Sequence, residues 1–133
     1  MSRRRAERID TGSEDRRAVT RSTPVSIIER AAEIALEHKA REVVSLDLQG
    51  ISSATDYFLL ATGTADIHVK AIADHILDAL REEGVRPNHI EGLQGGHWVL
   101  LDYIDVVVHV FHPTTRQFYQ LEELWGDAKR REF

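Results

Sequence analysis

Seven histidines are the residues of this 133-residue chain that most readily suggest metal or acid–base chemistry. Three of them, His97, His109 and His112, are close enough in sequence to be considered together. A helical zinc site would need the pattern HExxH, which the sequence does not contain. His109 and His112 are three residues apart on or just after an expected strand, so their side chains should point to opposite faces. We therefore expect structural or surface roles for these histidines.

The sequence gives little support for a phosphate-binding loop or for a pair of catalytic carboxylates. Residues 61–66 stand between an expected strand and a helix, but they contain one glycine and no Walker lysine. The glycine-rich residues 92–96 lead into a strand instead of a helix, so we expect a flexible loop there. Asp102 and Asp105 flank a short turn, where carboxylates accept hydrogen bonds from backbone amides more often than they hold a catalytic metal. No catalytic constellation is recognisable, and we expect that the protein is not an enzyme.

Trp98 is the more informative residue, because it follows Gly-Gly-His at the start of an expected strand. It is either an aromatic filler of the core or an anchor for a binding partner. A tryptophan suits the second role because it offers a large rigid apolar surface with one hydrogen-bond donor. The second tryptophan, Trp125, is expected to pack a C-terminal helix onto the core.

Composition places the chain among single-domain globular proteins. Hydrophobic residues make up 42% and charged residues 29%, and the length suffices for one core. The absence of cysteine excludes disulfides, thiolate-bound metals and thiol nucleophiles. The apolar runs are much shorter than the roughly 20 residues of a membrane-spanning helix, and no targeting signal is recognisable. We expect a cytoplasmic protein that does not enter a membrane.

The net charge of −5 conceals two opposite parts. Residues 1–22 carry seven arginines against four acidic residues and show no helical or strand periodicity, so we expect a disordered leader with a net charge of +3. The remaining residues have a net charge of −8. An acidic surface repels phosphate backbones, so we expect direct RNA contact to be peripheral at most and a basic protein to be the better partner.

Apolar periodicity predicts the elements of one domain over residues 23–128. Apolar side chains recur at three- and four-residue spacing over residues 24–38 and 66–83, which predicts two amphipathic helices. Strands are expected at residues 43–48, 57–62, 98–101 and 106–111. The last two should form an antiparallel hairpin, and their nearly continuous apolar character predicts a sheet covered on both faces.

A C-terminal helix capped by Thr114 or Thr115 is expected next, and residues 129–133 should form a frayed end. The order of elements predicts an α/β (α+β) fold, in which helices flank a mixed β-sheet.

Several blocks in order along residues 24–128 resemble the ribosome silencing factors, also called Iojap-like proteins. The blocks are Asp56-Tyr57-Phe58, Ala61-Thr62-Gly63, Ala71-Ile72-Ala73-Asp74, Glu91-Gly92, residues 98–103, residues 105–111, Tyr119-Gln120-Leu121-Glu122 and Leu124-Trp125. One departure is Ile104, where members commonly have glycine. Because a β-branched residue is strained at positive φ, we expect the hairpin to use another turn type. The leader is a second departure, since the family core does not require it.

The resemblance implies a fold similar to nucleotidyltransferases without their catalytic signature, and no metal or cofactor. It implies that the protein binds ribosomal protein uL14 of the large ribosomal subunit, blocks subunit joining and represses translation under nutrient limitation. It also implies a homodimer when the protein is free. The uL14-binding residues would be Trp98, carried over from the family motif, with Leu100 and Asp102 on the same strand face. Glu91 and Asp105 are further acidic candidates.

Three alternatives stay open from the residues alone. A degenerate or cryptic nucleotidyltransferase-like enzyme would need two converging carboxylates near Gly63. A metal-dependent hydrolase would need His97, His109 or His112 to converge. A purely structural homodimer would sediment with itself and not with large ribosomal subunits.

Overall fold

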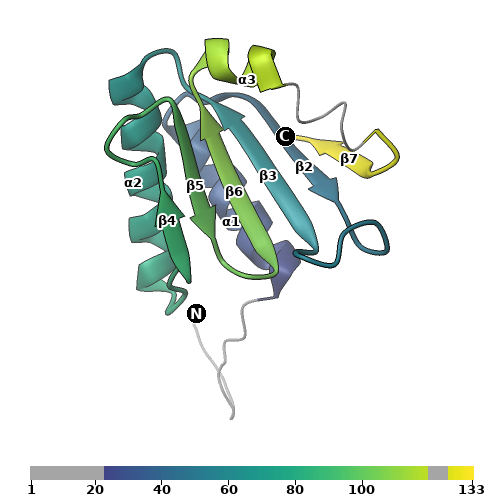
Figure 1. Cartoon of the computed structure of the whole chain (residues 1–133). Helices are drawn as coiled ribbons and strands as arrows, with labels where there is room; N and C mark the ends of the chain where they lie inside the picture. The colour runs from purple at the N-terminus through teal and green to yellow at the C-terminus, as the bar shows by residue number, and fades with distance from the viewer. Residues whose placement is uncertain (1–22, 120–125) are drawn as a thin grey trace.

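The computed structural model describes residues 23–119 and 126–133. Their strands form one sheet, and their helices pack beside it (Figure 1). In chain order the elements are α1 (Pro24–Glu37), β2 (Arg41–Asp47), β3 (Tyr57–Thr62), α2 (Asp66–Glu82), β4 (His89–Glu91), β5 (Trp98–Asp102), β6 (Val106–Phe111), α3 (Pro113–Tyr119) and β7 (Lys129–Glu132). The predicted α/β (α+β) class with a mixed sheet is confirmed. The kinship with nucleotidyltransferases stays a prediction. The expected leader, residues 1–22, and Trp125 lie outside the described residues.

Local chemistry explains where the two long helices begin. Thr23 Oγ1 accepts a hydrogen bond from the Ser26 N–H at 3.1 Å, and Pro24 occupies the first helical position, where its missing N–H costs nothing. The carboxylate of Asp66 lies in the first turn of α2, at the positive end of the helix dipole. Both helices end one residue earlier than the periodicity predicts.

The strands form a mixed sheet in the order β4-β5-β6-β3-β2-β7. β3 and β6 run parallel, and every other neighbouring pair is antiparallel, including the predicted β5–β6 hairpin. The expectation that residues 129–133 fray is wrong, because β7 pairs with β2 along the edge of the sheet. Neither β4 nor β7 was predicted, since both are short polar strands that are defined by backbone pairing with distant residues.

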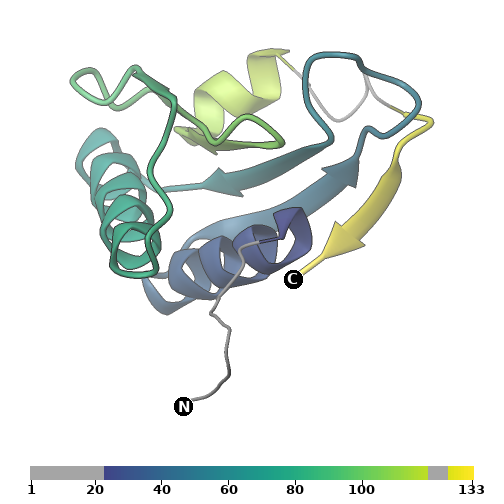
Figure 2. The same ribbon diagram turned by 90° about the horizontal axis from the view of Figure 1, so that it is seen from below.

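The sheet has two different faces. α1 and α2 cover one face, whereas α3 lies on the opposite side at the end of β6 (Figure 2). Val106, Val108 and Val110 pack beneath the long helices, and Phe111 packs on the other side with Trp98. Helices therefore flank the sheet on both sides, as predicted, although α3 has only seven residues. The second face of β6 also packs against aromatic side chains of its own sheet.

The start of α3 differs from the prediction in its cap. The helix begins at Pro113, and His112 Nδ1 accepts a hydrogen bond from the Thr114 N–H at 3.3 Å. His112 thus takes the capping role that was expected of Thr114 or Thr115. Among the described residues, no helix combines the length and apolar character needed to cross a bilayer.

Candidate functional site

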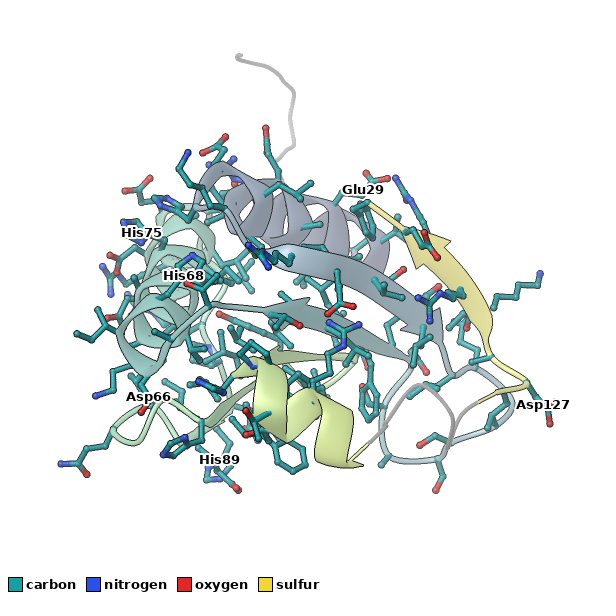
Figure 3. All side chains as sticks on the ribbon, turned by 90° about the horizontal axis from the view of Figure 1, so that it is seen from above. Glu29, Asp66, His68, His75, His89 and Asp127 are labelled. Carbon is teal, nitrogen blue, oxygen red and sulfur yellow. The ribbon has the colours of Figure 1, made fainter. Side chains whose placement is uncertain are left out.

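The three histidines considered as metal ligands do not converge on one point, although the rings of His97 and His112 are neighbours with 6.2 Å between centroids. His109 is buried on β6, His112 caps α3, and His97 lies in the loop before β5 with its Nδ1 3.3 Å from Asp66 Oδ1. Figure 3 shows Asp66 near the start of α2, and His89 on the side of the sheet that carries α3. Within residues 23–119 and 126–133, no three histidine, aspartate or glutamate side chains are arranged to hold a metal ion.

The turn between β3 and α2 is closed by its own contacts. Gly63 lies so close to the helix that a Cβ atom there would come within 2.9 Å of Val69 Cγ2. The Thr64 N–H donates to His68 Nδ1 at 2.8 Å, and His68 Nε2 lies 2.7 Å from the carbonyl oxygen of His38. The Thr64 N–H of this turn is thus already hydrogen-bonded within the protein. This supports a strand-to-helix turn and not a phosphate cradle.

The hairpin between β5 and β6 contains a strained residue. Asp102 Oδ1 accepts a hydrogen bond from the Ile104 N–H at 2.7 Å, as expected of a carboxylate that stabilises the turn. The Asp105 N–H donates to the Tyr103 carbonyl at 2.9 Å, and Ile104 between them has a φ of 74°. These are the features of the rare γ-turn with positive φ. The expectation of a turn without positive φ is therefore wrong, because this short connection holds a β-branched residue in that conformation.

Four of the five predicted partner-binding residues lie on the sheet face opposite α1 and α2. Alternation along β5 directs Trp98, Leu100 and Asp102 to this face. Pairing with β4 places Glu91 directly opposite Leu100, where the two side chains share a face. We call these four residues the docking face. Asp105 lies outside it, in the hairpin turn that follows β5.

Trp98 is packed against its aromatic neighbours and is partly exposed. Its ring lies against Phe111, with 5.3 Å between ring centroids, and its indole N–H donates to His109 Nδ1 at 3.0 Å. The side chain is nevertheless only half-buried, as are Leu100 and Asp102. Trp98 therefore packs as a core residue does while it keeps part of its side chain exposed.

The glycine-rich loop before Trp98 packs closely against its neighbours at two glycines. Gly92 has a φ of 78°, and a Cβ atom there would overlap the carbonyl oxygen of Trp98. A Cβ atom at Gly96 would lie 2.8 Å from the carbonyl oxygen of Asp66. Glycine thus allows the loop to approach both β5 and α2 closely.

The docking face is acidic at neutral pH. Glu91 and Asp102 contribute negative charge, and Asp105 adds another at its end. His89 lies opposite Asp102, with its Nε2 2.7 Å from Glu91 Oε2. Burial lowers the pKa of His109 from 6.5 to about 4, so this imidazole is neutral and adds no positive charge beneath the surface.

Sequence reasoning missed three residues on this side of the sheet. Val107 and His89 both pair with Asp102, and His109 pairs with Leu100. Alternation within residues 106–111 was an available signal for Val107 and His109. His89 had no such signal, because its place depends on the pairing of β4.

Comparison with known proteins identifies the family. The model of a family described as "ribosomal silencing factor during starvation" matches residues 21–133. The ribosomal silencing factor RsfS of Bacillus subtilis is 46% identical over 103 residues, which cover 77% of this chain and 87% of that protein. The chloroplastic protein Iojap of Zea mays is 33% identical over 107 residues, which cover 80% of this chain and 45% of that protein.

Solved structures agree with this relationship. The crystal structure of a Chromobacterium violaceum protein has a TM-score of 0.76 at 36% identity and covers 78% of this chain and 87% of its own. A Bacillus halodurans crystal structure has a TM-score of 0.72 at 37% identity and covers 82% of this chain and 99% of its own. The sequence blocks, the fold and these relatives together show that the chain belongs to the ribosome silencing factor (Iojap-like) family of ribosome-associated translation regulators.

Proposed function

We propose that the docking face binds ribosomal protein uL14 on the large ribosomal subunit, and that the bound protein blocks joining of the small subunit. Translation is thereby repressed when nutrients are limiting. The observation that carries the proposal is the half-buried Trp98 on a sheet face opposite the long helices, with Glu91 and Asp102 on the same face. Relatives named ribosomal silencing factors support the ribosome as the target.

The chemistry of the docking face suits a basic protein partner. Tryptophan is enriched among interface residues whose truncation costs most affinity, and Leu100 beside it adds apolar area. The acidic side chains complement positive charge on the partner and accelerate association. The same charges disfavour RNA phosphates, so RNA contact remains peripheral.

The mechanism is occlusion of a surface that the small subunit must contact. Inhibition then follows mass action and requires no turnover, cofactor or metal, so no enzymatic activity is involved. We propose that the free protein is a cytoplasmic homodimer, which the family resemblance supports. Sedimentation equilibrium of the purified chain tests the dimer.

Truncation of Trp98 tests the docking face. Trp98→Ala should fold and lose about 2 kcal/mol of binding free energy, or roughly 30-fold in affinity for immobilised uL14, because the apolar anchor is removed. Ile67→Ala is the matched control, since Ile67 is 80% exposed on α2 and away from the face. Undiminished retention of folded Trp98→Ala would remove this residue from the binding site.

Subunit joining is tested on sucrose gradients. Purified subunits should form fewer joined ribosomes when the wild-type protein is added, and the protein should travel with the large subunit. Trp98→Ala should restore joining at the same concentration. Sedimentation of the protein with itself alone would contradict the proposal and favour the homodimer alternative.

A further inference from the structure

His109 lies beneath the docking face and contacts its central aromatic residue. The side chain is only 4% exposed. The Phe58 ring meets the imidazole edge-on, with 4.5 Å between centroids, and the Phe111 ring lies nearly parallel to it at 5.8 Å. This aromatic packing restrains the imidazole to one position.

The hydrogen bond from Trp98 defines which nitrogen of His109 carries the proton. An indole N–H can only donate, so Nδ1, which lies 3.0 Å from it, is the unprotonated acceptor. The proton of the neutral ring is then on Nε2, which is buried without a hydrogen-bond partner in the described part of the chain. Because burial lowers the pKa to about 4, the ring is neutral at physiological pH and Nδ1 remains available.

Strand register makes this contact diagonal. Trp98 pairs with Phe111 and Leu100 pairs with His109, so the indole reaches along β6 to the second neighbour of its partner. The hydrogen bond acts at the far edge of the indole, while Phe111 supports the ring. Together they restrain both side-chain torsions of Trp98.

We propose that His109 is a positioning residue: by accepting the indole N–H, it holds Trp98 in the orientation that the partner binds. The inference rests on the proposed function, which makes Trp98 the anchor. A side chain that is ordered before association loses less conformational entropy on binding, and this raises affinity. His109 is buried and acts through Trp98 without touching the partner.

Three variants of the full chain separate positioning from stability. His109→Phe keeps an aromatic ring but removes the acceptor, so the indole N–H loses its partner. His109→Asn returns an acceptor near the position of Nδ1, because the asparagine amide has similar reach. Val108→Ala is the matched control. Val108 is the neighbour of His109 on β6 and points to the opposite face, so its truncation weakens the packing of the core beneath the helices.

Affinity for immobilised uL14, urea unfolding and the indole ¹⁵N–¹H resonance of Trp98 are measured for each variant. Trp98→Phe assigns that resonance, because the chain contains a second tryptophan. His109→Phe should shift or broaden the Trp98 signal and reduce affinity about tenfold, as expected for a lost hydrogen bond. His109→Asn should recover most of this affinity, and Val108→Ala should be destabilised without losing affinity.

Several outcomes would overturn the inference. Full affinity of His109→Phe, with Trp98→Ala still weak, would refute positioning while sparing the proposed function. Full affinity of Trp98→Ala would refute both. If His109→Phe does not fold, long-range ¹H–¹⁵N spectra of the wild-type protein decide the matter. An unprotonated Nδ1 at neutral pH supports the inference, and a protonated Nδ1, which cannot accept the indole N–H, excludes it.

Discussion

Burial of His109 makes stability depend on pH. The folded pKa of about 4 lies below the unfolded value of 6.5, so the unfolded chain binds a proton more readily as the pH falls. The contribution of neutral His109 to the free energy of unfolding is complete above pH 6.5 and is lost as the pH falls towards 4. We predict that the wild-type free energy of unfolding falls by about 2 kcal/mol more than that of His109→Phe between pH 7 and pH 5.

Urea unfolding of both proteins across this range provides the measurement. Carboxylates titrate in both chains, so their contribution cancels in the comparison. Parallel pH profiles would show that His109 is not held neutral by burial.

Ile104 stores backbone strain that can be removed. The residue is 61% exposed at a φ of 74°, so its side chain contributes little packing while its backbone is unfavourable. Ile104→Gly should be more stable than Ile104→Ala by about 1 kcal/mol, because only glycine relieves the strain and this gain exceeds its greater unfolded-state entropy. The measurement is thermal unfolding of the two variants. They form a matched pair because both lose nearly all of the isoleucine side chain. Equal midpoints would mean that the turn is not strained.

At the scale of elements, the loop between β4 and β5 should tolerate substitution poorly at Gly92. Gly50 provides a matched control, since its φ of 80° resembles the 78° of Gly92 but a Cβ atom at Gly50 would meet nothing within 4 Å. Gly50→Ala should cost about 1 kcal/mol through the backbone alone. Gly92→Ala should cost at least about 3 kcal/mol, because the new methyl group also overlaps the Trp98 carbonyl. Similar urea midpoints for the two variants would contradict this account.

The elements that sequence could predict are those with local periodicity. The apolar stripe of α2 and the apolar residues of β3 and β6 specify these elements from neighbours along the chain. β4 and β7 are three and four exposed residues at the two edges of the sheet. Their conformation depends on pairing with β5 and β2, so no local pattern identifies them.

The same distinction applies to the candidate site. Alternation within one strand was enough to bring Trp98, Leu100 and Asp102 together. The hydrogen bond between Trp98 and His109 depends on the register between two strands, which single-strand periodicity does not specify. Sequence therefore predicted which residues face outward, and the structure added how Trp98 is held.

Across the whole molecule, negative charge is not confined to the docking face. Asp74 and Glu82 are exposed on α2, which packs on the opposite side of the sheet. Removing two negative charges near the docking face changes the net charge of the protein as much as removing two from α2. Only the position of the lost charges differs, which allows local complementarity to be separated from the overall field.

Glu91→Gln with Asp105→Asn should slow association with uL14 more than Asp74→Asn with Glu82→Gln, because steering is strongest near the contact. Stopped-flow rates at about 0.02 and 0.3 M salt are the measurement. The difference between the double variants should be several-fold at low salt and should shrink at high salt, where charges are screened over less than about 10 Å. Asp102 is left intact because it accepts the hydrogen bond from Ile104. Equal slowing by both pairs would mean that overall charge, and not the acidic residues on and beside the docking face, directs the protein to its partner.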